Sequence, residues 1–128
     1  MNPSYKPAGY TSLAPYLVVT KAVPVIDFLK QVFDAAELRR FADPTGRIAH
    51  AEVRIDDTVL MLGEASNAFP PVPAHVHVFV ADVDAVYARA IAHGAVSIHP
   101  PTVTPEGDKR GGFRDAGGIE WWVSTQIS

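Results

Sequence analysis

The stretch HVHVFVADVDAVYARAIAHGA, residues 75–95, decides the fold class, because it joins a strand to a helix. Residues 75–80 alternate with the period of two that is typical of a half-buried strand. The two faces of this strand differ, since one carries His75, His77 and Phe79 and the other carries only valine. Residues 83–93 are rich in alanine and have the apolar spacing of an amphipathic helix. The stretch therefore predicts a strand that leads directly into a helix.

The same order of elements is expected in both halves of the chain. The second half adds strands at residues 96–99, 109–114 and 119–125, and the first half predicts a strand at 12–20, a helix at 22–36 and strands at 37–41, 47–55 and 58–62. Matching segments share an offset of 59 residues, since 28–36 matches 87–95 and 56–62 matches 115–121. We therefore expect an α+β fold made of two tandem βαβββ modules.

Proline and glycine divide this predicted repeat. Residues 1–11 lack periodicity and are expected to form an N-terminal arm, whereas residues 66–73, SNAFPPVP, hold three prolines and are typical of a linker. The first module then covers residues 12–65 and the second covers residues 74–128. Because the chain has only 128 residues, we expect both modules to share one structural domain.

The composition excludes several classes of protein. The chain has no cysteine, which excludes a disulfide scaffold, a thiolate nucleophile and cysteine-based metal sites. Its net charge of −3 and the absence of a basic stripe argue against a nucleic acid as partner. No apolar run approaches the roughly 18 residues of a membrane span, and the N-terminal sequence lacks the apolar core of a signal peptide. We therefore expect a cytoplasmic protein that makes no contact with a membrane.

Four segments of the chain together resemble the glyoxalase/bleomycin-resistance/dioxygenase superfamily, also called the vicinal oxygen chelate superfamily. They are VIDFLKQVFDAAELRRF (25–41), GRIAHAEVRIDDTVLML (46–62), HVHVFVADVDAVYARAIAHGA (75–95) and GDKRGGFRDAGGIEWWVST (107–125), and they are most similar to the PhnB-like branch. The resemblance implies that each module forms a curved mixed sheet of four strands and that the sheets surround a cleft. It also implies small-molecule chemistry in that cleft and a homodimer.

The resemblance further implies where a metal would bind. Metal-dependent members take one ligand from each of the first, fourth, fifth and eighth strands, and these are usually His, Glu, His and Glu. By spacing, the four positions fall on Ala14, near Met61, on His75 and on Trp122. Alanine, methionine and tryptophan cannot replace the ligands of Ni, Zn, Fe or Mn, so we expect no tightly bound metal and no other cofactor. If a divalent metal does bind, the sequence favours His75 together with His77, His50 or Glu120.

Strand alternation assigns polar and aromatic side chains to the faces that would line the cleft. The expected ligand-binding residues are Tyr16, His50, Glu52, His75, His77, Phe79, Glu120 and Trp122. The candidates for catalysis are His75, His77 and Glu120, either at a shifted metal site or as a metal-free acid–base pair. The histidines could instead be hydrogen-bonded cleft residues without chemistry. Alternation also places Trp121 in the core and Trp122 in the cleft, where its ring could stack on a ligand, while Phe69 either covers the cleft or belongs to the connector.

Three functions follow from these observations. The first is a glyoxalase/bleomycin-resistance-like protein that binds a small molecule, as in antibiotic sequestration, and whose metal site is degenerate. The alternative is a metal-dependent lyase, isomerase or dioxygenase with relocated ligands among His50, Glu64, His75, His77 and Glu120. The third is a structural or regulatory dimer whose cleft is filled by Tyr16, Met61, Phe79 and Trp122. The sequence leaves open whether the protein is an enzyme.

Overall fold

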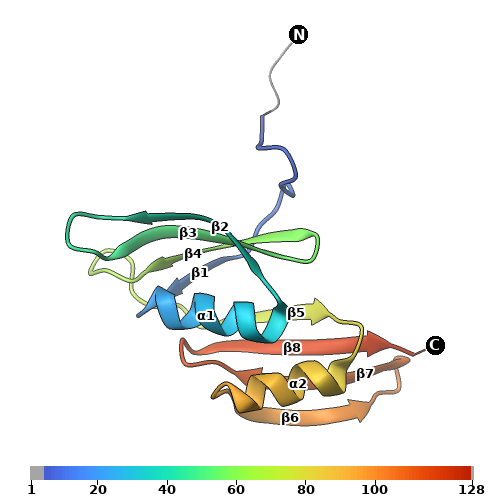
Figure 1. Ribbon diagram of the computed structural model, residues 1–128. Coiled ribbons are helices and arrows are strands. Elements are labelled where there is room, and N and C mark those ends of the chain that lie inside the picture. The colour runs from blue at the N-terminus through green and yellow to red at the C-terminus, as the bar shows by residue number, and fades with distance from the viewer. Residues whose placement is uncertain (1–4, 128) are drawn as a thin grey trace.

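The computed structural model describes residues 5–127, so residues 1–4 of the expected arm and Ser128 lie outside the described residues. Its elements are β1 (Tyr16–Val19), α1 (Ala22–Phe33), β2 (Ala36–Ala42), β3 (Ile48–Ile55), β4 (Thr58–Glu64), β5 (Ala74–Phe79), α2 (Val83–Ala92), β6 (Val96–Val103), β7 (Asp108–Arg114) and β8 (Ile119–Gln126). They form two four-stranded sheets with the orders β1-β4-β3-β2 and β5-β8-β7-β6 (Figure 1). The pairs β1/β4 and β5/β8 are parallel and the other pairs are antiparallel. The predicted α+β fold, with the βαβββ order repeated, is confirmed.

Strand β6 is longer than the sequence predicted. It continues through Pro100 and Pro101 to Val103, whereas a strand ending at His99 was expected. β6 is one of the two edge strands of its sheet, where a missing proline N–H removes no bond from an interior ladder. The register of β6 against β7 shifts between His99 and Thr102. An irregular edge strand therefore tolerates two prolines that would end a central strand.

Two elements of the first half are shorter than expected. β1 begins at Tyr16 instead of residue 12. Helix α1 ends at Phe33 because Asp34 adopts the left-handed conformation, with φ of 56°, and its N–H bonds to the carbonyl of Leu29. The helices have 12 and 10 residues, and no helix within residues 5–127 is long and apolar enough to cross a membrane.

Both helices are held at their start by a side chain from the last strand of the same half. Glu64 at the end of β4 accepts the N–H of Ala22 at 2.9 Å. Thr125 near the end of β8 accepts the N–H of Val83 at 3.0 Å. These contacts satisfy N–H groups that have no partner inside a helix. Both the helix starts and the capping residues lie 61 residues apart in sequence, so the two halves repeat this contact as well as the fold.

One apolar core joins the two halves. Figure 1 shows α1 between the two sheets, and rings on α1 contact rings on β7 and β8 with centroid distances of 5.2 to 6.2 Å. The residues concerned are Phe28, Phe33, Phe113 and Trp121. Each sheet therefore turns one face toward this shared core and the opposite face outward. We call these outward surfaces the first open face, on β1–β4, and the second open face, on β5–β8.

Candidate functional site

Four side chains on the first open face form a hydrogen-bonded group, which we call the first-face network: Tyr10, Tyr16, His50 and Glu52. The Tyr16 hydroxyl on β1 lies 3.2 Å from His50 Nδ1 on β3. The other ring nitrogen, His50 Nε2, lies 2.8 Å from Glu52 Oε2, and Tyr10 donates to Glu52 Oε1. A carboxylate can only accept, so the imidazole proton is assigned to Nε2, and Nδ1 accepts from the Tyr16 hydroxyl.

Gly63 on β4 makes the contact between Tyr16 and His50 sterically feasible. β4 lies between β1 and β3, so the Tyr16 ring crosses β4 to reach His50. A Cβ atom at Gly63 would lie 2.8 Å from the Tyr16 hydroxyl and 2.7 Å from the Ala49 carbonyl oxygen. Any larger residue at this position would displace the phenol.

Glu52 is the most deeply placed member of the first-face network, at 5% exposure. Burial by itself would raise the pKa of Glu52. Hydrogen bonds from Tyr10 and His50, together with the Arg39 guanidinium 3.5 Å away, outweigh burial and hold the pKa of Glu52 below its usual value. The carboxylate is therefore ionised at neutral pH and fixes the orientation of His50.

Three rings cross the second open face, and we call them the aromatic row: His75, Trp122 and His99. The ring planes of His75 and Trp122 lie 12° apart with a centroid distance of 5.8 Å, and His99 lies 6.5 Å from Trp122. Trp122 lies against the backbone of β7, where a Cβ atom at Gly112 would be 2.8 Å from the indole. The indole Nε1 is buried and has no acceptor in the part of the chain that the structure describes. The alternation of β8 is confirmed, since Trp121 is fully buried and Trp122 is on the open face.

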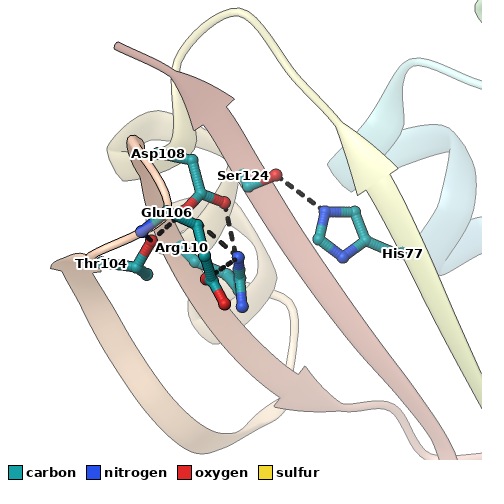
Figure 2. Close-up of polar contacts among 6 residues, drawn as sticks. All are labelled: His77, Thr104, Glu106, Asp108, Arg110 and Ser124. Carbon is teal, nitrogen blue, oxygen red and sulfur yellow. Dashed lines mark hydrogen bonds and ion pairs between the residues drawn. The ribbon is translucent and has the colours of Figure 1, made fainter. Parts of the chain in front are cut away.

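His77 on β5 is exposed on the second open face and is hydrogen-bonded to β8. Its Nε2 lies 2.7 Å from the hydroxyl of Ser124, a fully buried residue, and Figure 2 shows this contact. Nearby, Arg110 is held by Asp108 and Glu106. Burial lowers the pKa of His77, and the charge of Arg110 lowers it further. His77 is therefore neutral at physiological pH, and it packs against the exposed ring of Phe79 at 5.0 Å.

The predicted site residues lie on two faces of the chain. Tyr16, His50 and Glu52 gather on the first open face, and His75, His77, Phe79, Glu120 and Trp122 lie on the second. A single cleft with all eight residues was expected, but the sheets of one chain do not close around a common cleft because both pack on the shared core. Glu120 pairs with Arg114 at 2.8 Å. The parts that these residues play in binding or catalysis remain predictions.

The residues present do not fit a divalent metal. Of the four positions implied by the resemblance, only His75 has a nitrogen or oxygen ligand in its side chain. Glu64, one of the proposed relocated ligands, bonds to the N–H groups of Ala22 and Ile48. Within residues 5–127 no three His, Asp or Glu side chains are grouped so that they could hold a metal ion. We therefore assign no chemical step in this chain to a metal.

Three hollows lie beside these groups. One of about 400 Å³ on the first open face is lined by Tyr16, Arg47, Gly63 and Phe69 among others. One of about 270 Å³ on the second open face is bordered by His99, Arg110 and Trp122. A third, of about 290 Å³, lies between the turn at residues 55–58 and β5, where His77 and Phe79 border it. Phe69 lies in the connector between β4 and β5 and borders the hollow on the first open face, and whether it covers a ligand stays a prediction.

Sequence reasoning missed several contributors to both faces. Tyr10 lies in a segment without periodicity, so no pattern could have placed it on Glu52. His99 was not among the residues expected to line the cleft. Opposite His99 in register is Gly112, and its missing side chain is the signal that a large ring covers this point. Ser124 shares the face of Trp122 by alternation, but a serine alone carries no functional signal.

The fold and these two faces define a class: a tandem βαβββ protein with polar and aromatic side chains on its open sheets. The sequence profile of the Glyoxalase/Bleomycin resistance protein/Dioxygenase superfamily matches residues 13–123, and the chain belongs to this superfamily. An uncharacterized protein of Mycobacterium tuberculosis (strain ATCC 25618 / H37Rv) is 34% identical in an alignment that covers 91% of this chain and 75% of that protein. The superfamily expected from the resemblance is thus confirmed.

Solved structures of several bacterial proteins have the same fold. TioX from Micromonospora sp. ML1 is 26% identical, with a TM-score of 0.77 over 91% of this chain and 99% of that chain. A PhnB protein from Bacillus cereus is 18% identical, with a TM-score of 0.73 over 90% of this chain and 99% of that chain. TnmS3, an antibiotic binding protein from Streptomyces sp. CB03234, is 22% identical, with a TM-score of 0.71 over 91% of this chain and 97% of that chain. A PhnB protein is thus among the solved structures that share this fold.

Proposed function

We propose that this protein binds a flat aromatic small molecule and does so through a site whose metal ligands are degenerate. The observation that carries the proposal is the aromatic row, in which Trp122 lies flat over Gly112 between two imidazole rings. Aromatic pairs of this kind contribute about 0.5–1.5 kcal/mol beyond the burial of their surface. A planar ligand that stacks on this row would gain both the aromatic pair contribution and the free energy of burying its surface.

The buried indole N–H of Trp122 supplies a polar anchor beside the aromatic row. A buried donor without a partner costs about 1–3 kcal/mol, and Trp122 Nε1 has no acceptor among residues 5–127. A ligand oxygen in the adjoining hollow of about 270 Å³ would accept this hydrogen bond. Stacking together with one directed hydrogen bond is typical of apolar ligand sites with few polar groups.

A homodimer would complete the cleft. The two open faces of one chain point away from the shared core, so each is an open surface rather than a closed site. If the first open face of one copy lies over the second open face of another, all eight predicted residues border one cleft. The exposed rings of Phe41, Phe69 and Phe79 would then be covered. We propose this arrangement, and a cytoplasmic location, together with the binding function.

The comparisons support a binding role at the level of the superfamily. TnmS3, which has this fold, is an antibiotic binding protein, so the architecture is compatible with binding a drug-sized molecule. The donor set supports the same choice, because three of the four positions that hold a metal in catalytic members carry alanine, methionine and tryptophan here. The metal-dependent lyase, isomerase or dioxygenase has no comparable observation in its favour.

A thermal-shift screen of planar aromatic natural products would test the proposal. We expect a hit that raises the unfolding midpoint equally in EDTA and with added Ni, Zn, Mn or Fe. The Trp122→Ala variant should lose that shift, while Ile91→Ala, which removes an exposed apolar side chain from α2, should keep it. One divalent ion per chain in elemental analysis, or full binding by Trp122→Ala, would contradict the proposal.

A further inference from the structure

We propose that the first-face network is a proton-accepting site that binds an acidic hydroxyl, such as that of a phenol or an enol, as its oxyanion. This inference goes beyond the binding function proposed above and does not depend on the aromatic row. It rests on three features of the first open face: an oriented chain of hydrogen bonds, a hollow beside it, and a buried guanidinium nitrogen that lacks a partner.

The hydrogen bonds run in one direction, from Tyr16 through His50 to Glu52. Glu52 Oε2 accepts from His50 Nε2 at 2.8 Å, which leaves His50 Nδ1 as the acceptor for the Tyr16 hydroxyl at 3.2 Å. The phenol proton therefore points back into the protein, and the lone pairs of its oxygen face outward. Because Tyr16 is 49% exposed, its oxygen can accept a hydrogen bond from a bound ligand.

The carboxylate at the end of the chain is kept ionised by its surroundings. Tyr10 and Arg39 contact Glu52 Oε1, and His50 contacts Glu52 Oε2, so both oxygens are engaged. These contacts outweigh burial and hold the pKa of Glu52 below its usual value. The hydrogen bond of 2.8 Å between His50 Nε2 and Glu52 Oε2 fixes the imidazole ring so that Nδ1 faces the Tyr16 hydroxyl.

The hollow beside Tyr16 contains a donor suited to an anion. Arg47 lines this hollow, and its Nη groups bond to the Glu64 carbonyl at 2.9 Å and approach Asp43 at 3.6 Å. Its Nε is buried and has no hydrogen-bond partner within residues 5–127. The positive charge of Arg47 at the wall of the hollow favours an anionic ligand oxygen there. The ring of Phe69, which also lines the hollow, offers an apolar wall for the rest of the ligand.

The proposed transfer is balanced without any co-reactant. The ligand hydroxyl gives its proton to the Tyr16 oxygen while the Tyr16 proton moves to His50 Nδ1. The ligand becomes an oxyanion facing Arg47, and His50 becomes an imidazolium held by Glu52. The net charge of the site is unchanged, and the transfer reverses when the ligand leaves. Tyr16 touches the ligand. His50 receives the proton, and Glu52 acts as a positioning residue that orients His50.

The absorbance of p-nitrophenol, which changes on ionisation, provides the test. With the purified full-length protein in excess near pH 6, we expect the ratio of bound nitrophenolate to nitrophenol to exceed that of the free dye about tenfold, which corresponds to one pKa unit. Tyr16→Phe should abolish this gain. Tyr5→Phe, which alters an exposed tyrosine outside the network, should leave it intact.

Glu52→Gln separates positioning from mere structure. In the Glu52→Gln variant, p-nitrophenol should bind largely as the neutral phenol. The ¹⁵N signals of His50 in this variant should no longer report a proton held on Nε2 alone. Thermal unfolding of each variant checks that it is folded. Equal ionisation with wild type and Tyr16→Phe, or no binding of the dye to wild type, would overturn the proposal. A dye signal lost in Trp122→Ala but kept in Tyr16→Phe would also overturn it and would leave the aromatic-row function standing.

Discussion

At the scale of single residues, each open face depends on a glycine that is covered by an aromatic ring. Tyr16 crosses Gly63 to reach His50, and Trp122 lies over Gly112. Neither glycine is among the residues with positive φ, so the requirement is for space and not for backbone freedom. Two rings that would otherwise stand away from the sheet can therefore lie across it, which creates the polar network in one case and the aromatic row in the other.

Gly112→Ala should disrupt the aromatic row. The added Cβ would lie 2.8 Å from the indole of Trp122, and the ring must move or the strand must shift. Overpacking of this kind typically costs about 1–3 kcal/mol, and chemical denaturation would measure it. Intrinsic tryptophan fluorescence should change as Trp122 moves, while Trp121 stays buried. Fluorescence and stability equal to those of wild type would show that the indole is not confined by this contact.

Among the carboxylates within residues 5–127 whose pKa shift is resolved, Asp115 is the one whose pKa is raised. Its oxygens accept the N–H groups of Gly117 and Ile119 and the indole N–H of Trp121 at 2.8 to 3.1 Å. Burial raises the pKa of Asp115 despite these bonds. Folding therefore favours the protonated form of this group.

Asp115→Asn should lower the free energy of unfolding by about 1–3 kcal/mol, since one of its buried hydrogen bonds is lost. The difference from wild type should also depend on pH. Because the pKa of Asp115 is raised on folding, its titration stabilises the protein most below the ordinary value of 3.8, and this contribution is lost as the pH rises through the folded-state pKa. Urea denaturation from pH 3 upward would measure this, and a difference that grows with pH would contradict the assignment.

At the scale of elements, the start of each helix is fixed by the last strand of its own half. Glu64 performs this role for α1, whose N-cap residue Lys21 makes no side-chain capping bond in the described chain. Thr125 performs it for α2, in addition to Asp82, which accepts from Ala85. The contact couples the position of each helix to the last strand of its half, so it is absent until β4 or β8 has formed.

Glu64→Ala should destabilise the protein by about 1–2 kcal/mol, within the range measured for lost helix caps. Glu64→Ala should lower the free energy of unfolding more than Thr125→Ala does. The reason is that α2 keeps the cap from Asp82, while α1 has no second cap among residues 5–127. Lys21→Ala is the matched control at the same helix end and should be nearly neutral. Equal losses from Glu64→Ala and Thr125→Ala in denaturant unfolding would show that Asp82 does not compensate.

Local periodicity was sufficient to predict most of the elements. Alternation placed His75, His77 and Trp122 on one face, and it distinguished Trp121 from Trp122 correctly. It failed where tertiary context decides the outcome, as at Pro100 and Pro101, which are tolerated only because β6 lies at an edge. The capping role of Glu64 joins residues 42 positions apart, and no short-range pattern reports such a contact.

At the scale of the whole molecule, alternation predicts which face a side chain occupies but not which faces meet. Both sheets pack their apolar faces on one core with α1 between them (Figure 1). The polar and aromatic faces are consequently turned outward, and residues expected in one cleft lie on two surfaces. A second copy can bring such surfaces together because symmetric contacts place different patches of identical chains opposite each other. In the proposed homodimer, the eight residues would border one site that neither copy forms alone.

Mixing two variants that each fail to bind the ligand would test that assembly directly. Met61→Arg places a charged side chain on the first open face, and Trp122→Ala removes the aromatic row from the second. If each cleft takes one face from each copy, a heterodimer of the two variants contains one cleft with both changes and one with neither. Random exchange of equal amounts should therefore restore about one quarter of the wild-type ligand sites, as counted by isothermal titration calorimetry. If each site is built from one chain, every site in the mixture carries one of the two changes, and mixing restores none.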